Sequence, residues 1–352
     1  MRKIILLCIV LSIVPSMLLT GCKADAASVG QGLEPSAATV FAMDTVMEIT
    51  AYGADEELMK KVSFRIKELE AALSTTDKSS EVFAVNLWGR GKVSVDTLRL
   101  VKYGIDFGEL TGGLLDVTVY PVVKEWGFTT GNYKIPDKSV LAELIKKVDY
   151  RRIRLDEETS TVSIPEGTMI DFGSLAKGYT GDVLLKMLKA NGISSAMVNL
   201  GGNVQTLGTK PDGTEWKIGI ESPGRDGHIG IVPVADKAVI TSGGYERYFK
   251  GADGNIYWHI FNPRTGYPAK NGLISVSIVT DTGIYGEALS TSLFVMGLEA
   301  ASEFWRSHRD FEAVFIMESG KIFITEGLED RFKLAGASDG ASGGGGLSVI
   351  RP

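Results

Sequence analysis

Cysteine and histidine are scarce in this chain, which has two cysteines and three histidines among its 352 residues. These few residues form no cluster with the spacing of metal ligands, so the sequence does not predict a zinc site. Their spacing does not support a Ser-His-Asp arrangement either. Acidic residues outnumber basic residues by 43 to 37, so the chain has no excess of positive charge that would attract nucleic acid or anionic lipid. We therefore expect no nucleic-acid partner.

A long apolar run at the start of the chain predicts export. It covers residues 4–19, follows two basic residues and ends in Leu-Thr-Gly-Cys at 19–22. A run this short with a basic flank is typical of a signal peptide rather than a membrane span. Its end resembles a bacterial lipobox, which predicts that Cys22 is lipidated and anchors the chain to the outer face of the cell membrane. The alternative is a plain signal peptide that happens to contain cysteine.

Composition divides the chain into four parts. Residues 1–21 are the expected lipoprotein signal peptide, and residues 22–39, rich in small residues, read as a flexible tether. Residues 40–334 form the folded part, as one large domain or as two tightly joined lobes. Residues 335–352 form a tail whose first part is almost entirely small and polar, and which is therefore expected to be disordered.

Apolar periodicity predicts a mixed α+β fold. Helices are expected over 55–74, over 96–110 with Asp96 as its N-cap, over 285–296 and over 300–307. Strands are expected at 45–50, 197–199, 204–207, 216–220, 238–241, 257–261 and 274–279, with a last hairpin that pairs 313–317 with 322–325. Because the turns between strands are short, we expect mainly antiparallel sheets flanked by helices.

Residues 171–178, which read DFGSLAKG, are the most informative stretch of the chain. They lie between a strand-like run at 168–170 and a helical pattern that continues to Gly192. Free backbone N–H groups and the positive end of a helix dipole favour bound phosphate at such a place. The stretch is not a Walker A loop, because Tyr179 stands where that loop needs lysine. The alternative is an ordinary strand-to-helix turn.

Three residues of the helix expected at 285–296 suggest a hard metal ion. Glu287, Ser290 and Thr291 have the i, i+3, i+4 spacing that places them on one face. One carboxylate with two hydroxyls suits Mg²⁺, which keeps waters and takes other oxygens from substrate phosphates. The alternative is a polar helix face that is merely solvated.

Residues 259–268 read HIFNPRTGYP and predict a strand that runs into a tight turn. Arg264 in this turn has two interpretations. Its guanidinium either binds phosphate or forms an ion pair that ties the turn to a carboxylate. His259 lies on an otherwise apolar strand, where histidine is commonly a core residue whose ring nitrogens are hydrogen-bonded.

Together these segments resemble the FAD:protein FMN transferase family, known as ApbE flavin transferases, and the resemblance runs from about Phe41 to Leu334. The family patterns "AMGT", "TGGAFDPTVGP", "DLGGIAKG", "SGxYER", "HIIDPRTGYP" and "DALST" match residues 41–45, 111–121, 171–178, 242–247, 259–268 and 287–291. Asp44 stands where glycine is commoner in the family, Glu287 replaces an aspartate, and Thr76 replaces a tyrosine that contacts the flavin.

The resemblance implies an ApbE-like fold that binds FAD with Mg²⁺ and transfers FMN to a threonine of a target flavoprotein, releasing AMP. The residues it implies as FAD contacts are Met43, Leu114, Leu115, Asp116, Asp171 and Lys177. The metal ligands it implies are Ser174 through its carbonyl, Glu287, Ser290 and Thr291.

A transfer of this kind needs a base for the acceptor's hydroxyl proton, and His259 is our candidate. Two other functions remain open from the sequence. In the first, water replaces the acceptor hydroxyl, which gives a Mg²⁺-dependent FAD pyrophosphatase. In the second, the chain is a non-catalytic FAD-binding lipoprotein, although simple storage of FAD would not need the metal-site oxygens.

Overall fold

The computed structural model describes residues 33–224, 226–335 and 346–352. The predicted signal peptide, Cys22 and most of the predicted tether and tail lie outside these residues. Within the described ranges, no helix is both long and apolar enough to cross a membrane. Residues Glu34–Pro352 form one compact unit, so the single-domain alternative is confirmed.

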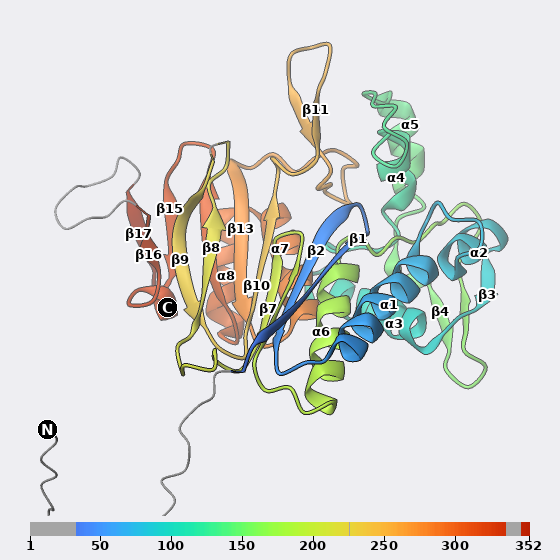
Figure 1. Ribbon diagram of the computed structural model, residues 1–352. Coiled ribbons are helices and arrows are strands. Elements are labelled where there is room, and N and C mark those ends of the chain that lie inside the picture. Colours follow the sequence, from blue (N-terminus) through green and yellow to red (C-terminus); the bar gives the residue numbers. More distant parts are fainter. Residues whose placement is uncertain (1–32, 225, 336–345) are drawn as a thin grey trace, which may run out of the picture. The chain divides into compact units, whose positions relative to one another are not determined.

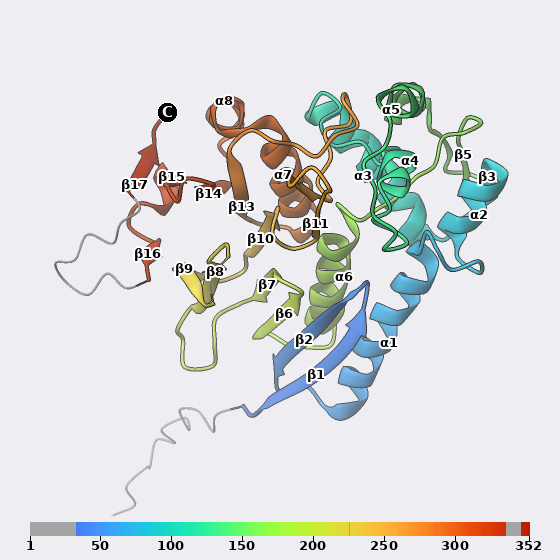
Figure 2. The same cartoon turned by 90° about the horizontal axis from the view of Figure 1, so that it is seen from above.

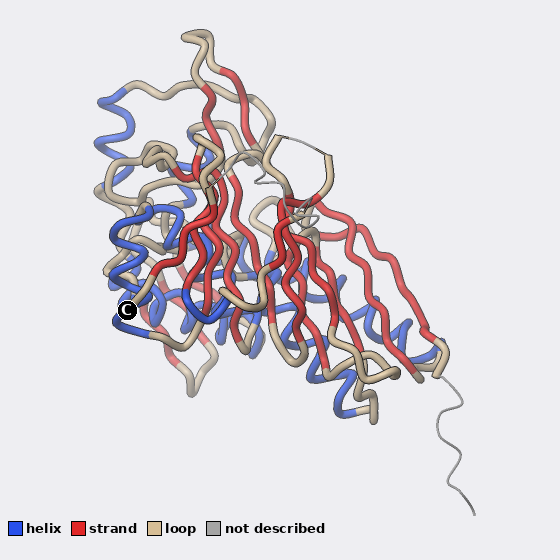
Figure 3. Tube along the Cα trace, turned by 90° about the vertical axis from the view of Figure 1, so that its left-hand side faces the viewer, coloured by secondary structure: helices blue, strands red, loops and turns tan. Residues whose placement is uncertain are grey.

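A nine-stranded sheet forms the centre of the molecule (Figure 1). Neighbouring strands are antiparallel except for the last pair, in which β15 and β17 run parallel. Figure 3 shows the strands running side by side, with the helices gathered on one side of them. In spatial order the strands are β1 (Pro35–Ala42), β2 (Thr45–Tyr52), β6 (Ala196–Leu200), β7 (Asn203–Leu207), β10 (Ala238–Gly243), β13 (Leu273–Thr280), β14 (Glu312–Met317), β15 (Ile322–Thr325) and β17 (Leu347–Ile350).

Four helices pack on one face of this sheet and a small sheet packs on the other (Figure 2). The helices are α1 (Glu56–Leu73), α6 (Ala176–Ala190), α7 (Gly283–Met296) and α8 (Leu298–His308). The small sheet consists of β8 (Trp216–Glu221), β9 (His228–Val234) and β16 (Lys333–Leu334). The helix α1 forms where its apolar spacing predicts it, and Asp55 caps it by accepting a hydrogen bond from the Leu58 N–H at 2.8 Å.

A second group of elements lies beside the N-terminal half of the sheet (Figure 1). It contains α2 (Glu81–Trp88), α3 (Val95–Leu110), α4 (Tyr120–Glu125), α5 (Lys138–Ile145), a 3₁₀ turn (Tyr150–Arg152) and the small strands β3 (Arg90–Lys92), β4 (Arg154–Asp156) and β5 (Thr161–Ser163). The hairpin of β11 (Tyr248–Lys250) and β12 (Ile256–Trp258) projects from the body, and a second 3₁₀ turn spans Glu326–Leu328.

The mixed α+β class with mainly antiparallel sheets is confirmed, but both predicted ends of the folded part were wrong. The strand β1 begins at Pro35 inside the predicted tether, and β17 lies inside the predicted tail. The small residues of β1 give no apolar pattern that would predict a strand. In the structure every second side chain of β1 is less exposed, and each of its residues pairs with one of β2. The apolar residues of β17 extend the sheet in parallel with β15.

Two local predictions also differ from the structure, and three short helices were not predicted. Asp96 is not the N-cap of α3, because Ser94 takes that position and Asp96 lies in the first turn, where it pairs with Arg65. Residues 168–170 form no strand, since only Met169 makes an isolated bridge, to Val119. The short helices α2, α4 and α5 were not predicted, because six to eight residues carry too little periodicity to be recognised.

Candidate active site

The sequence-predicted residues come from segments that meet near one end of the sheet. The turn between β1 and β2 and the projecting β11–β12 hairpin lie at the same end of the molecule (Figure 1). Asp44 of the turn lies 3.9 Å from the guanidinium of Arg247, at the base of the hairpin. The loop after α3 meets the turn after β12, where the Arg264 guanidinium donates to the Gly112 carbonyl at 2.9 Å.

The start of α6 meets the first turns of α7 through Glu287. Its side chain is buried, with the whole residue 4 % exposed. One carboxylate oxygen lies 2.9 Å from the Lys177 ammonium, and the other accepts a hydrogen bond from the Gly178 N–H at 2.6 Å. The DFGSLAKG segment and the predicted metal helix are therefore joined directly, by an ion pair between the buried Glu287 and the half-buried Lys177 that the sequence did not predict.

Three hydroxyl groups gather beside this ion pair. Ser290 Oγ lies 2.8 Å from Ser242 Oγ, and Thr291 Oγ1 lies 3.3 Å from the same Ser242 oxygen. The face formed by Ser290 and Thr291 is therefore not simply solvated, since it packs on the end of β10. Sequence reasoning gave no role to Ser242, although it opens the "SGxYER" match.

The donor set at this place fits a hard cation. All of its candidate ligands are oxygens, which Mg²⁺ prefers. The Gly178 N–H donates to Glu287, and among the described residues no backbone N–H donates to the Ser174 carbonyl, so that oxygen can accept a ligand. Lys177 already balances the charge of Glu287, so a cation there would share or replace this partner. Within the described ranges, no three His, Cys, Asp or Glu residues form a metal cluster.

Asp171 lies half-buried at the start of the same segment. Its carboxylate accepts a hydrogen bond from the Gly173 N–H at 2.8 Å. Burial raises the pKa of this carboxyl, while that hydrogen bond and the charges of Arg247 and Lys177 act in the opposite direction. The positive charges of Arg247 and Lys177 therefore both act on the start of this segment.

His259 is half-buried at the base of the β11–β12 hairpin. Its Nδ1 lies 3.2 Å from the Arg247 carbonyl, which can only accept, so Nδ1 carries the proton in this contact and Nε2 is left as an acceptor. Burial is the main cause that lowers the pKa of His259 to about 4, and the nearby positive charges of Arg247 and Lys177 contribute to this shift. The ring is therefore neutral at neutral pH, as a general base must be.

Met43 and Asp44 form the tight turn between β1 and β2. Both have left-handed backbone conformations, with φ of 49° and 60°, and the Met43 N–H donates to Glu70 at 2.7 Å. Aspartate tolerates this conformation better than most residues. Asp44 can therefore replace the glycine that is commoner at this position in the resemblance.

The loop after α3 does not present all of its predicted side chains to a ligand. Leu115 is buried in the core, whereas Leu114 is half-buried. The Asp116 carboxylate is also buried, and its two oxygens accept from the Thr118 N–H at 2.8 Å and the Tyr150 N–H at 3.1 Å. These two side chains therefore shape the loop. Arg264 ties the loop to the turn after β12 through the Gly112 carbonyl, whereas one of its two expected roles was a contact with a carboxylate.

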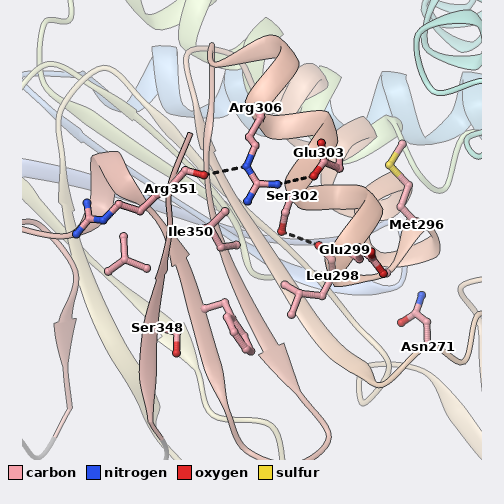
Figure 4. A pocket seen from close by; sticks show the side chains of 13 residues that line it. Asn271, Met296, Leu298, Glu299, Ser302, Glu303, Arg306, Ser348, Ile350 and Arg351 are labelled. Atoms are coloured by element: carbon pink, nitrogen blue, oxygen red, sulfur yellow. Dashed lines mark hydrogen bonds and ion pairs between the residues drawn. The ribbon is translucent and has the colours of Figure 1, made fainter.

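A separate surface hollow lies between α8 and the strands β15 and β17 (Figure 4). In it, Arg306 donates to Glu303 at 2.7 Å and to the Arg351 carbonyl at 2.9 Å. None of the sequence-predicted site residues lines this hollow. It is therefore distinct from the candidate active site.

Comparison with known proteins agrees with this arrangement. The sequence pattern of the ApbE family matches residues 43–315. The chain belongs to the ApbE family. It is 31 % identical over 296 residues to a FAD:protein FMN transferase of Klebsiella pneumoniae, covering 82 % of this chain and 92 % of that protein. It is 32 % identical over 298 residues to a FAD:protein FMN transferase of Treponema pallidum, covering 79 % and 82 %.

Solved structures of the family share the fold. The ApbE protein of Thermotoga maritima superposes with a TM-score of 0.79 at 30 % identity, covering 85 % of this chain and 99 % of that one. The flavin transferase ApbE of Vibrio cholerae superposes with a TM-score of 0.73 at 29 % identity, covering 85 % and 100 %. The ApbE-like fold is therefore confirmed.

Proposed function

We propose that this protein is a FAD:protein FMN transferase that moves FMN from FAD to a threonine hydroxyl of a target flavoprotein and releases AMP, with Mg²⁺ as cofactor. Family membership and the names of its relatives support the transferase activity. The observation that carries the site is the contact between Lys177 and Glu287. It joins the N-terminus of α6, a place that favours bound phosphate, to a set of oxygen donors on α7 that suit a hard cation.

The proposed reaction exchanges one phosphorus–oxygen bond for another. The acceptor hydroxyl oxygen attacks the phosphorus nearer riboflavin, and the bond from that phosphorus to the bridging oxygen breaks. AMP leaves with the bridging oxygen, and the hydroxyl proton passes to a base. His259 is the proposed base, because no described residue bonds to its Nε2 while Nδ1 contacts the Arg247 carbonyl.

The residues that would hold Mg²⁺ are Ser174 through its carbonyl, Glu287, Ser290 and Thr291. When bound, the cation would stabilise negative charge on the diphosphate. Lys177 provides a further positive charge at the start of α6, and Arg247 provides one at the hairpin base. Such a displacement depends mostly on positioning and charge stabilisation, which these fixed groups supply.

We also propose that the protein is exported and anchored by lipid on Cys22, so that it acts at the outer face of the cell membrane. The complete Leu-x-Gly-Cys pattern after the apolar run supports this. Its proposed partners are FAD, an acceptor flavoprotein that carries the target threonine, and the membrane that holds the lipid.

The competing pyrophosphatase would use the same groups with water as the nucleophile. The test is to incubate the protein lacking its first 22 residues with FAD and Mg²⁺, with and without a candidate acceptor, and to quantify AMP and free FMN. Transfer predicts AMP that depends on the acceptor, with little free FMN. Equal amounts of AMP and free FMN, independent of the acceptor, would support hydrolysis. No AMP under any condition would support a non-catalytic FAD-binding protein.

A further inference from the structure

The helices α6 and α7 begin without caps of their own. The N-cap positions are Leu175 for α6 and Thr282 for α7, and neither side chain accepts a hydrogen bond from its own helix. The first N–H groups of a helix have no partner within the helix, and burying them unpaired is unfavourable. Some other group must therefore satisfy them at this crossing.

Each helix supplies the missing cap of the other. Asp182 of α6 accepts from the Gly283 N–H at 2.7 Å and from the Ile284 N–H at 2.9 Å, both in the first turn of α7. Glu287 of α7 accepts from the Gly178 N–H at 2.6 Å in the first turn of α6. Each carboxylate thus lies at the positive end of the neighbouring helix, where negative charge is stabilised.

The two backbones pass too closely for the helices to shift while these bonds persist. A Cβ atom added to Gly178 would lie 2.3 Å from the Gly283 carbonyl oxygen. A Cβ atom added to Gly283 would lie 1.8 Å from Nε2 of Gln205, which itself donates to the Gly178 carbonyl at 2.9 Å. The relative position of α6 and α7 is therefore fixed by the glycines together with the reciprocal caps.

We infer that Asp182 is a positioning residue, which fixes the first turn of α7 on α6 and so sets Glu287 against Lys177. Glu287 lies one helical turn after Gly283, so a displaced first turn carries Glu287 with it. The proposal rests on the proposed function and adds to it a residue that touches neither Lys177 nor the hydroxyl groups. The competing view is that Asp182 only stabilises the fold.

A spectroscopic readout separates the two views without measuring activity. The sequence contains two Lys-Gly pairs, Lys177-Gly178 and Lys250-Gly251. Labelling lysine with carbonyl ¹³C and glycine with ¹⁵N therefore selects two amide signals, and Lys250→Arg identifies the Gly251 signal. The Gly178 amide donates to a carboxylate, which shifts its proton signal downfield. In Asp182→Ala we expect this signal to move upfield, while the Gly251 signal stays in place.

Kinetics provide the second readout. A misplacement of about 1 Å can cost about 100-fold in rate, so we expect Asp182→Ala to lower kcat by 10-fold to 100-fold. The KM for FAD should change less than threefold, because Lys177 and Asp171 remain. The matched control is Glu81→Gln, since Glu81 of α2 accepts from the Ser94 N–H at 2.9 Å before α3, away from α6 and α7. It should keep kcat and the Gly178 signal.

The outcomes distinguish this inference from the proposed function. An unmoved Gly178 signal and wild-type kcat in folded Asp182→Ala overturn the positioning role, even if the melting temperature falls. If Asp182→Ala does not fold, Asp182→Asn is used, which keeps one acceptor oxygen but loses the charge and the second acceptor. It should move the Gly178 signal and lower kcat in the same directions by smaller amounts, and no change in either overturns the positioning role. A wild-type protein that transfers no FMN contradicts the proposed function. A Gly178 signal that moves in the Asp182 variants but not in the control supports the positioning of α7 on α6 by Asp182, whether or not FMN is transferred.

Discussion

Replacing Glu287 by glutamine tests the charge at the centre of the candidate site. Glu287→Gln keeps the shape of the side chain and can still accept from the Gly178 N–H. It removes the negative charge that lies 2.9 Å from the Lys177 ammonium, and it places that ammonium beside a neutral amide. The variant therefore isolates the charge from the packing.

The expected loss of stability follows from the contacts of Glu287. A hydrogen bond to a charged group contributes about 1.5–3 kcal/mol, and removing one partner of a fully buried pair costs about 3–5 kcal/mol. The Lys177 side chain is 28 % exposed, so water can solvate the ammonium that is left. We therefore expect a loss of about 2 kcal/mol. In a domain of this size that corresponds to roughly 4 °C in melting temperature.

The functional effect is measured as the dependence of FMN transfer on Mg²⁺ concentration. Removing the one carboxylate from the donor set should raise the Mg²⁺ concentration for half-maximal activity by about tenfold or more. Glu287→Asp keeps the charge and restores the residue that is usual in the resemblance, so it should be tolerated or improve activity. Full activity of Glu287→Gln in the presence of a chelator would refute the metal assignment.

Three further outcomes are expected. His259→Asn should slow transfer by roughly 100-fold while FAD binding stays within a few-fold of wild type, and near-normal transfer by the folded variant would move the base to a carboxylate such as Asp171. Because the pKa of His259 is about 4 when folded and about 6.5 when unfolded, the unfolded chain binds its proton first as pH falls. The wild type should therefore lose stability between pH 6.5 and 4, and urea titrations should show a smaller loss in His259→Asn; equal losses would contradict the shift. Cys22→Ser should leave the protein unprocessed or release it from the membrane fraction, and unchanged lipid labelling would refute the anchor.

Several parts of the fold could be predicted because their patterns are local. The apolar spacing that predicts α1 lies within one stretch of sequence. The same holds for the single face shared by Glu287, Ser290 and Thr291. By contrast, β1 was read as tether because alanine and serine do not mark a strand, and only its pairing with β2 reveals it.

The contacts that build the site could not be predicted, because they join residues far apart in the chain. Glu287 meets Gly178 across 109 positions, and Ser242 meets Ser290 across 48. The role of Asp182 depends on the crossing of α6 and α7, where no local pattern marks it. The predicted side chains of Leu115 and Asp116 face inward for a similar reason, since Tyr150 closes the loop from elsewhere in the chain.

The mass of the acceptor tests the central claim most directly. The protein lacking its first 22 residues is incubated with FAD, Mg²⁺ and a candidate acceptor flavoprotein, and the intact acceptor is then weighed by mass spectrometry. We predict a gain equal to one FMN group on a threonine, absent when that threonine is replaced by valine and absent without the enzyme. An acceptor of unchanged mass, with FAD split into free FMN and AMP, would contradict the transferase assignment.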